Sequence, residues 1–304
     1  MSRSIVVTGA AGFLGSWVTK QLLEEGWRVT AFDRVRDDTK LRRIAGNAAA
    51  DTVTWHDGDI ADPNTIGPVI REARPDRVIH LAAVLIPVCK DDPVTGARIN
   101  VIGHINVMEA AADAGCGHVV YASSGAATGR ARDGALFTVY GTFKHWNEEF
   151  SATRWRDRGI ASIGLRPAVV YGPGREVGAT AFVNAAIEDV VAGRPHRLTT
   201  RWRHRVEYVE EIADAFCKCA ALDVEGAHAC DLTTKVTDEN DLIAVLQYVA
   251  PGCAVLMPED ESAFREPLPS DTGPLETLIG PRNHVGLAEG VARTIAIMRK
   301  QGQV

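Results

Sequence analysis

The sequence predicts an α/β protein with a parallel, doubly wound sheet and a smaller second lobe. Short apolar, β-branched runs alternate with longer segments of helical periodicity, a rhythm typical of such sheets. The first run ends in a glycine-rich turn, and the second ends in an acidic residue. At 304 residues the chain is long enough to bury a large core in one elaborate domain or two modest ones.

The first β-branched run, residues 5–8, leads into Gly9, Gly12 and Gly15, and an amphipathic helical pattern follows. A strand, a tight turn and a helix N-terminus together present backbone N–H groups and a positive dipole end to a phosphate. Gly9 permits the turn, Gly12 lets the backbone approach a pyrophosphate, and Gly15 lets helix and strand pack closely. Such a turn can also be purely structural, so the next strand is needed to choose between these interpretations.

The second apolar run, residues 28–32, ends in Asp33, eighteen residues beyond Gly15. A carboxylate at this place binds both hydroxyls of an adenosine ribose and repels a 2′-phosphate, which favours NAD over NADP. Arg34 and Arg36 follow directly and could offset that repulsion, so NADP stays an alternative. Asp33 could also simply open a polar turn, but the glycine turn upstream favours the cofactor interpretation.

The next elements follow in the same rhythm. Residues 39–50 form a polar helix or loop, and a third strand is expected over residues 52–56. A helix over 62–73, a fourth strand with its exit turn over 75–83, a long helix over 93–114 and a fifth strand over 118–122 come next. Ligands of such sheets lie at the carboxyl ends of the strands, where we expect Gly12, Asp33, Asp59, Ala83 and Ser124 to converge.

Composition and charge argue against several other classes of protein. The chain is 46% apolar and 24% charged, and its net charge of −6 offers no basic surface for nucleic acid or an anionic membrane. No apolar run approaches the ~18 residues of a membrane span, and no targeting segment is visible, so we expect a cytoplasmic protein. The six cysteines are expected to be reduced and mostly buried, and no spacing of metal-ligand residues suggests a metal site.

Tyr140 and Lys144 open the next predicted helix, four residues apart on one face. An ammonium near a phenol favours the phenolate, which can exchange a proton with an alcohol or a carbonyl near neutral pH. The hydroxyl of Ser124, at the end of the preceding strand, can hold the same oxygen. This spacing alone occurs on many solvated helices, but its position after a dinucleotide-binding pattern favours a catalytic role.

These motifs occur in the order found in one enzyme family. The matching segments are residues 8–15, 59–60, 80–83, 123–124, 140–144 and 166–174, and the similarity continues through residues 206–215 and 287–291. The sequence therefore resembles the extended short-chain dehydrogenases/reductases, in the NAD-dependent epimerase/dehydratase group. The resemblance covers essentially the whole chain.

This resemblance implies a Rossmann domain over residues 1–166, joined by 206–233, and a discontinuous substrate-binding lobe within 167–304. Tyr140 would be the general acid/base, Lys144 would bind the nicotinamide ribose, and Ser124 would orient the reacting oxygen. The implied cofactor-binding residues are Gly9, Ala11, Gly12, Phe13, Leu14, Gly15, Asp33, Arg34, Asp59, Ile60, Leu81, Ala82, Ala83, Asn100, Tyr140, Lys144, Pro167 and Val170. The expected substrate-binding residues are Val84, Ser124, Gly125, Arg175, Thr180 and His204. Members of the family often dimerise through the helices that here span 93–114 and 140–156, so we expect a homodimer.

Departures from the family pattern bear on the substrate. The 4,6-dehydratases carry an Asp-Glu pair where this chain has Gly125 and Ala126, so no acid is in place to protonate a leaving hydroxyl. Nucleotide-sugar epimerases usually carry Asn where this chain has Val169 and Arg where it has His204, although arginines flank His204. The loop between Ser124 and the catalytic tyrosine is also shorter than in those epimerases. His204, like Arg175 and Thr180, could bind the substrate or simply be solvated.

The sequence favours a NAD-dependent dehydrogenase acting on a secondary alcohol of a small polar substrate, such as a sugar, sugar acid or polyol. The Tyr140 phenolate would take the hydroxyl proton while a hydride passes to the nicotinamide. The same centre could return the hydride to the other face of a transient ketone, which would make the protein a sugar epimerase. A non-catalytic dinucleotide-binding protein is the third hypothesis, and the matched set of Ser124, Tyr140 and Lys144 argues against it.

Overall fold

The computed structural model describes residues 3–129, 134, 136–178, 180–198, 201–257, 271–282 and 284–302. The chain divides into two compact units. The first comprises the described residues within Met1–Pro167, Ala213–Leu232 and Thr272–Pro281, and the second those within Ala168–Ile212, Thr233–Asp271 and Arg282–Val304. The sequence placed a first boundary at residue 166 and returned 206–233 to the first domain, but it did not anticipate the return of 272–281.

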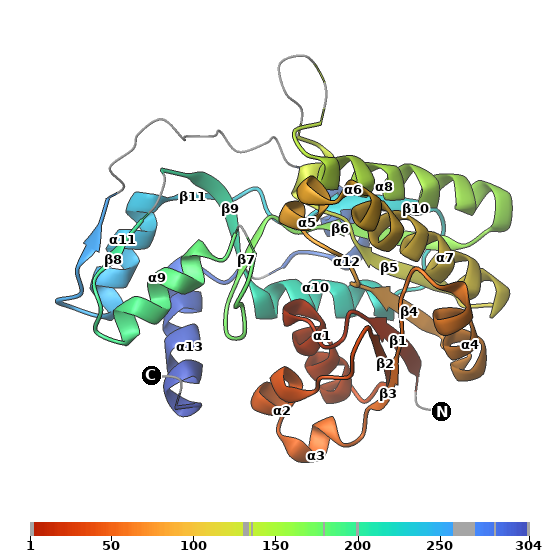
Figure 1. Ribbon diagram of the computed structural model, residues 1–304, viewed down its shortest axis with the longest axis horizontal. Coiled ribbons are helices and arrows are strands. Elements are labelled where there is room, and N and C mark those ends of the chain that lie inside the picture. The colour runs from red at the N-terminus through yellow and green to blue at the C-terminus, as the bar shows by residue number, and fades with distance from the viewer. Residues whose placement is uncertain are drawn as a thin grey trace. The chain divides into compact units, whose positions relative to one another are not determined.

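A seven-stranded parallel sheet forms the centre of the first unit, in the order β10-β6-β5-β4-β1-β2-β3 (Figure 1). Its strands are β1 (Ser4–Thr8), β2 (Arg28–Asp33), β3 (Thr54–Asp57), β4 (Arg77–His80), β5 (His118–Ala122), β6 (Ala161–Arg166) and β10 (Ala227–Asp231). The order runs outward from β1 in both directions, so the doubly wound fold predicted from the sequence is confirmed. Gly9 and Ser124 therefore follow strands that end at the same edge of the sheet.

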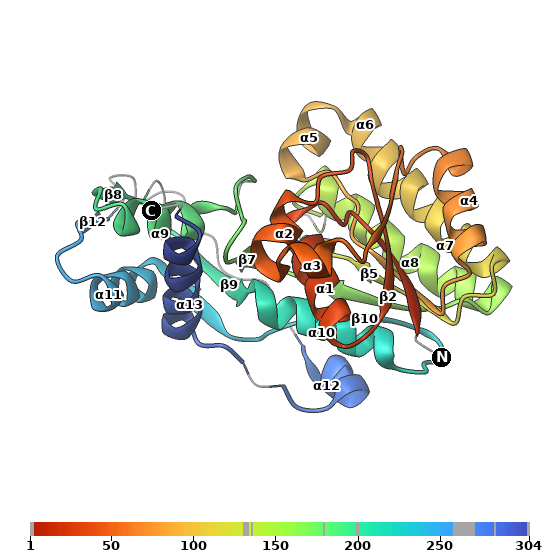
Figure 2. The same cartoon turned by 90° about the horizontal axis from the view of Figure 1, so that it is seen from below.

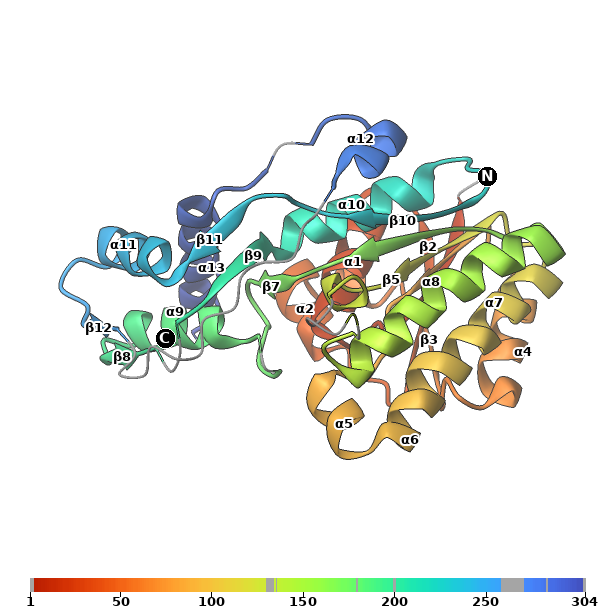
Figure 3. The ribbon, with the colours of Figure 1, turned by 90° about the horizontal axis from the view of Figure 1, so that it is seen from above.

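Helices cover both faces of this sheet. One layer holds α4 (Pro63–Ala73), α7 (Gly103–Asp113) and α8 (Val139–Arg158), which lie in a row in Figures 2 and 3. The other holds α1 (Phe13–Glu24) and the part of α10 (Val209–Ala221) from Ala213 onward, and Cys217 Sγ of α10 donates to Val18 O of α1. The remaining helices are α2 (Thr39–Ala45), α3 (Asn47–Ala50), α5 (Ile86–Asp91), α6 (Pro93–Ala97), the 3₁₀ turn η2 (Gly125–Ala127) and α12 (Gly273–Ile279), which packs against β10.

The long helix expected over residues 93–114 is interrupted by a π-helical turn, η1 (Arg98–Ile102), between α6 and α7. This turn buries Asn100, whose side-chain Oδ1 accepts from Val84 N at 3.0 Å and whose Nδ2 donates to Val84 O at 2.9 Å. Asn147 of α8 in turn donates to Asn100 O at 3.0 Å. The wider turn is therefore held by side chains from other segments, which a regular helical period does not reveal.

The second unit contains two small sheets and three helices. Strands β7 (Val169–Tyr171), β9 (Arg203–Tyr208) and β11 (Val236–Asp238) form one sheet, with β9 in the middle, and β8 (His196–Arg197) pairs with β12 (Val255–Leu256). Helices α9 (Phe182–Val191), α11 (Glu239–Val249) and α13 (Leu287–Lys300) pack against one another. Gly290 of α13 lies so close to Tyr171 that an added Cβ would sit 2.9 Å from the ring carbon Cζ.

Candidate active site

The glycine turn after β1 is built on close backbone approaches. Gly9 has a φ of +71°, and a Cβ there would lie 2.6 Å from Ala82 N, so this position requires glycine. A Cβ on Gly15 would overlap Gly9 O and lie 2.8 Å from Ala10 Cα, so glycine lets α1 start directly against the turn. Gly12 is the N-cap of α1, and no described side chain caps this helix end. The turn thus leaves the positive end of α1 available to a phosphate.

A cavity of about 410 Å³ lies at this turn. Its lining comprises Gly9, Ala11, Gly12, Phe32, Asp33, Arg34, Gly58, Asp59, Ile60, Leu81, Ala82, Ala83, Val84 and Ile99. Ten of these residues are among those expected to bind the dinucleotide, and Val84, expected to contact substrate, lies with them. Sequence reasoning missed Phe32, Gly58 and Ile99. The sequence signal for Gly58 is a glycine between two acidic residues at the end of β3. In the structure this position requires a small residue, because a Cβ there would lie 2.8 Å from Thr65 Cβ.

Asp33 binds the glycine turn as well as facing the cavity. Its Oδ2 accepts from Ala11 N at 2.9 Å, and its Oδ1 accepts from Arg34 N at 2.7 Å. Burial raises the pKa of Asp33 above its ordinary value, while these two backbone hydrogen bonds and the Arg34 charge act in the opposite direction. Each carboxylate oxygen keeps a further lone pair, which is what two ribose hydroxyls need.

The other residues predicted to bind cofactor do not line this cavity. Phe13, Leu14 and Gly15 form the first turn of α1 and do not line it. Asn100 is not in the lining either, and its amide holds the backbone of Val84, which is. Pro167 is the last residue of the first segment of the first unit, and its carbonyl accepts from Gly125 N at 3.0 Å. Val170 lies in β7 of the second unit, where it is 8% exposed.

Tyr140 and Lys144 lie on the first turns of α8, as the sequence predicts. Thr138 caps this helix by accepting from Gly141 N at 2.9 Å. A Cβ on Gly141 would overlap Ala126 O, so the start of α8 packs directly on the η2 turn that follows Ser124. Ser124 Oγ accepts from Ala126 N at 3.1 Å, and its hydroxyl proton is free to reach a substrate oxygen. The structure therefore brings the serine turn and the tyrosine helix together.

Lys144 is buried and aimed at the end of β5. Its Nζ donates to Ala122 O at 2.7 Å and lies 5.7 Å from the centroid of the Tyr140 ring. Burial lowers the pKa of Lys144 to about 8, although Cys89 and Glu148 act to raise it. Below that pH the side chain is an ammonium beside a phenol, which is the arrangement that favours a phenolate.

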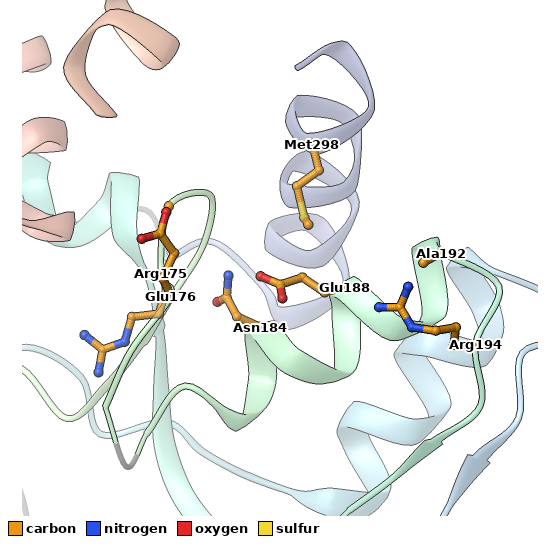
Figure 4. Close-up of a pocket in the computed structure, with 8 residues that line it drawn as sticks. Arg175, Glu176, Asn184, Glu188, Ala192, Arg194 and Met298 are labelled. Carbon is orange, nitrogen blue, oxygen red and sulfur yellow. The ribbon is translucent and has the colours of Figure 1, made fainter. Parts of the chain in front are cut away.

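The second unit holds the remaining residues predicted to bind substrate. Arg175 Nη2 donates to Thr180 Oγ1 at 2.8 Å, and the His204 ring stacks on Trp202 with centroids 6.4 Å apart. Arg175 lines a cavity of about 430 Å³, and Thr180 and His204 do not. The other lining residues are Gly174, Glu176, Asn184, Glu188, Ala192, Arg194 and Met298, which come from the loop after β7, from α9 and the turn after it, and from α13 (Figure 4).

That cavity carries charges of both signs. In Figure 4 the Glu188 carboxylate lies beside Asn184 on α9, with Met298 reaching toward it from α13. Burial raises the pKa of Glu188, and repulsion from Asp189 and Glu176 adds to the effect. Asn184 accepts from Gly172 N at 3.0 Å and donates to Gly172 O at 2.8 Å, so its amide fixes the Gly172 turn.

A family model described as the NAD dependent epimerase/dehydratase family matches residues 5–231. The chain belongs to this family. The match covers the glycine turn, Asp33, Ser124, Tyr140 and Lys144 in one alignment, so the resemblance proposed from the sequence is confirmed. The protein is therefore an NAD-dependent enzyme of the extended short-chain dehydrogenase/reductase type.

Full-length relatives share this family. The chain is 28% identical over 319 residues to "UDP-glucose 4-epimerase" of Mycolicibacterium smegmatis, which covers 98% of this chain and 99% of that one. A solved UDP-glucose 4-epimerase from Thermus thermophilus, in complex with NAD, is 25% identical with a TM-score of 0.79, over 97% of this chain and 99% of that one. The fold also matches that of a UDP-N-acetylglucosamine 4-epimerase from Methanobrevibacter ruminantium, with a TM-score of 0.87 at 20% identity over 99% of both chains.

The residues of the first unit fit NAD. The uncapped start of α1 suits the pyrophosphate, the Asp33 carboxylate suits the ribose, and the small side chains of Ala82 and Ala83 leave room for a flat ring against the backbone. NAD, when bound, supplies a hydride acceptor and donor. Among the described residues, no cluster of three or more His, Cys, Asp or Glu side chains could hold a metal ion, and no helix is long and apolar enough to cross a membrane.

Proposed function

We propose that this enzyme epimerises a hydroxyl-bearing carbon of a nucleotide sugar through a transient ketone. The observation that carries the proposal is the alignment of the chain, over nearly the whole of both lengths, with a UDP-glucose 4-epimerase. This reverses the order in which the sequence alone placed the two activities, since a dehydrogenase came first there. Both activities use the same Ser124, Tyr140 and Lys144.

The proposed roles follow from where these groups lie. The Tyr140 phenolate would remove the proton of the substrate hydroxyl. The resulting phenol would return a proton to the ketone oxygen after the transient ketone has presented its other face. The Lys144 ammonium, held by Ala122 O, would stabilise the phenolate before the first of these steps and after the second. The Ser124 hydroxyl would donate to the oxygen that gains negative charge. General acid–base catalysis of this kind typically contributes about 10²–10⁴-fold in rate.

A dehydrogenase acting on a smaller polyhydroxylated substrate is the second candidate. Val169 favours it, because nucleotide-sugar epimerases usually carry an asparagine amide at this position. Val169 is 3% exposed and pairs with Val206 across β7 and β9, so its side chain offers no hydrogen bond to a nucleotide sugar. Gly125 and Ala126 leave dehydration without an acid at their position, so we propose no dehydratase activity.

The two candidates differ in what accumulates. The enzyme would be incubated with NAD in molar excess over each substrate in turn: UDP-glucose, UDP-galactose, their N-acetyl analogues, and a free sugar, a sugar acid or a polyol. The sugars would then be separated by chromatography. An epimerase forms the isomeric nucleotide sugar with no stoichiometric rise in absorbance of reduced nicotinamide. A dehydrogenase gives that rise with a free sugar, sugar acid or polyol, and this result would overturn the epimerase proposal.

Two tyrosine variants would test the assigned mechanism. Tyr140→Phe removes the phenol, and we expect turnover to fall by about 10²-fold or more while NAD still binds. Tyr248→Phe is the matched control, because Tyr248 lies on α11 with 81% of its surface exposed and should leave both properties unchanged. Full activity of Tyr140→Phe would remove this residue from the mechanism.

We also infer a homodimer built through α6, α7 and α8 of the first unit. Large apolar side chains are exposed along this row of segments: Val94 of α6 at 69%, Ile102 of η1 at 42% and Trp146 of α8 at 37%. Such exposure on neighbouring helices is typical of an interface. Light scattering should give about twice the chain mass, and Ile102→Asp should give a monomer; a monomeric wild-type protein would contradict the proposal.

A further inference from the structure

Glu148 is a buried acid that the proposed mechanism does not use. It lies on α8, one turn beyond Lys144 and two turns beyond Tyr140, so the three side chains share one face of the helix. The Glu148 side chain is only 8% exposed. A carboxylate is seldom buried to this extent unless it is paired and hydrogen-bonded, so its partners show what it does.

The partners of Glu148 come from the ends of two neighbouring strands. Arg166, at the end of β6, donates from Nε to Oε1 at 2.8 Å and from Nη2 to Oε2 at 2.7 Å. Ser123, directly after β5, donates its hydroxyl to Oε1 as well. Asp231, at the end of β10, lies 4.0 Å from Arg166 Nη1. One carboxylate therefore ties the ends of β5 and β6 to the helix that carries Tyr140 and Lys144.

This arrangement fixes the residue that follows Ser123. Because successive side chains of an extended segment point to opposite sides, a Ser123 hydroxyl held by Glu148 directs the Ser124 hydroxyl the other way. Ser124 caps η2 with extended backbone angles, φ −163° and ψ 149°, as this alternation requires. The bond from Ser123 to Glu148 thus orients Ser124 without touching it.

Glu148 also acts electrostatically on Lys144. Besides the Tyr140 phenol, whose ring centroid is 5.7 Å from Nζ, the other titratable groups that act on this lysine in the described structure are Cys89 of α5, His80 of β4 and His104 of α7. Burial raises the pKa of the Cys89 thiol, lowers the pKa of His80 to about 3 and lowers the pKa of His104 well below its ordinary value. These last three groups are therefore uncharged near pH 7, so the anions beside Lys144 are Glu148 and, in the proposed mechanism, the Tyr140 phenolate.

We propose that Glu148 is a positioning residue of the reaction centre: it orients Ser124 through Ser123, and its charge keeps the buried Lys144 in the ammonium form. The proposal rests on the proposed function for its link to turnover. Its two parts are separable, because one depends on a hydrogen bond and the other on a charge.

Two substitutions separate these parts. Ser123→Ala removes the hydrogen bond and leaves the charge, so we expect kcat to fall several-fold at every pH with no change in the shape of the pH profile. Glu148→Gln removes the charge and keeps the side-chain shape, so we expect the alkaline limb of kcat to move to lower pH by about one unit. Lys144 would then be mostly neutral at pH 8, and kcat there should fall about five-fold. Glu149→Gln, the next residue on α8 but exposed, is the matched control and should change neither.

The Glu148→Gln variant leaves the Arg166 guanidinium without its carboxylate, which could prevent folding. The double variant Glu148→Gln/Arg166→Gln removes both charges and keeps amide groups that can hydrogen-bond to each other. The Lys144 midpoint should move in the same direction but by less, because the Arg166 cation is lost together with the anion. A second measurement does not depend on activity and uses protein labelled with ¹³C at the lysine ε-carbon. The chain has seven lysines, and the signal of Lys144 is the one that is missing from the spectrum of Lys144→Met.

The nuclear magnetic resonance titration decides the inference. We expect the Lys144 midpoint to fall by about one unit in Glu148→Gln, by less in the double variant, and to stay unchanged in Glu149→Gln. An unchanged midpoint in both Glu148 variants would overturn the electrostatic part of the proposal, whatever the enzyme turns over, and an unchanged kcat in Ser123→Ala would overturn the orienting part. A shifted midpoint in a protein without epimerase activity would instead leave this inference standing and refute the proposed function.

Discussion

Lys144 should give the stability of this protein a pH dependence that can be isolated by one substitution. Burial lowers the pKa of Lys144 to about 8, against an ordinary value of 10.5. Between these two pH values the unfolded chain binds a proton at this site that the folded chain does not. The free energy of unfolding therefore rises with pH across this window as far as Lys144 is concerned. A gap of about 2.5 units, at about 1.4 kcal/mol each, amounts to about 3 kcal/mol.

Lys144→Met removes this contribution. The difference in unfolding free energy, wild type minus Lys144→Met, should increase by about 3 kcal/mol between pH 7.5 and pH 10.5. The absolute difference near pH 7 is a poorer test, because the variant gains by not burying a charge but leaves Ala122 O without its 2.7 Å donor. That loss costs about 1–3 kcal/mol and opposes the gain, whereas the change with pH does not depend on it.

The measurement is urea unfolding of both proteins in the same buffers at several pH values, followed by circular dichroism. Groups away from Lys144 titrate alike in the two proteins, so their effects cancel in the difference. Both proteins carry Tyr140→Phe, because Lys144 alters the titration of the Tyr140 phenol. Lys218→Met is the control for the loss of a lysine side chain, since Lys218 on α10 is 46% exposed. If the unfolding free energies of Lys144→Met and the wild type ran parallel from pH 8 to 10.5, the lowered pKa of Lys144 would be refuted.

Three further predictions concern the cofactor turn and the second unit. Gly15→Ala should lower the free energy of unfolding by several kcal/mol, because the added Cβ would overlap the turn. Gly12→Ala should fold normally, because its Cβ would meet only Gly9 O at 3.1 Å, but it should lose NAD affinity in calorimetry. Asp33→Asn should weaken NAD binding and narrow its preference over NADP, and unchanged affinities would contradict the ribose assignment. Burial raises the pKa of Glu207 to about 7, so its contribution to the free energy of unfolding should fall by about 3 kcal/mol from pH 4.5 to 7. The difference between wild type and Glu207→Gln, which can still accept from Ala168 N, should show this fall in urea unfolding.

The cofactor region could be predicted in detail because its chemistry is local. The φ of +71° at Gly9 and the approach of Gly15 to Gly9 O arise within the turn, and the Asp33 carboxylate binds Ala11 N of that turn. The approach of Gly9 to Ala82 N comes instead from the segment that follows β4. A strand, a turn and a helix in succession already determine this geometry. The doubly wound arrangement follows as well, because a rhythm of alternating strands and helices admits few topologies, although the sequence predicts only the first five of the seven strands.

Other features depend on contacts that no local pattern encodes. Glu148 meets Arg166 and Ser123 across 18 and 25 residues, and the sequence marks it only as one of two adjacent acids on a helix. The same holds for the π-helical turn at Asn100, which is set by Val84. Residues 272–281 belong to the first unit because α12 packs on β10, although nothing in that segment continues the alternation of strands and helices.

The substrate is harder to read than the cofactor for a physical reason. NAD is bound in large part by backbone N–H groups and close approaches, which only a few residue types allow, so each position leaves a mark on the sequence. A substrate is bound by side chains, and many residue types serve equally well. The second unit, which holds Arg175, Thr180 and His204, is built on strands of two to six residues with loops between them, so it has little periodicity to interpret. A single departure such as Val169 therefore weighs less than an alignment over the whole chain, and it is the product analysis that must decide between them.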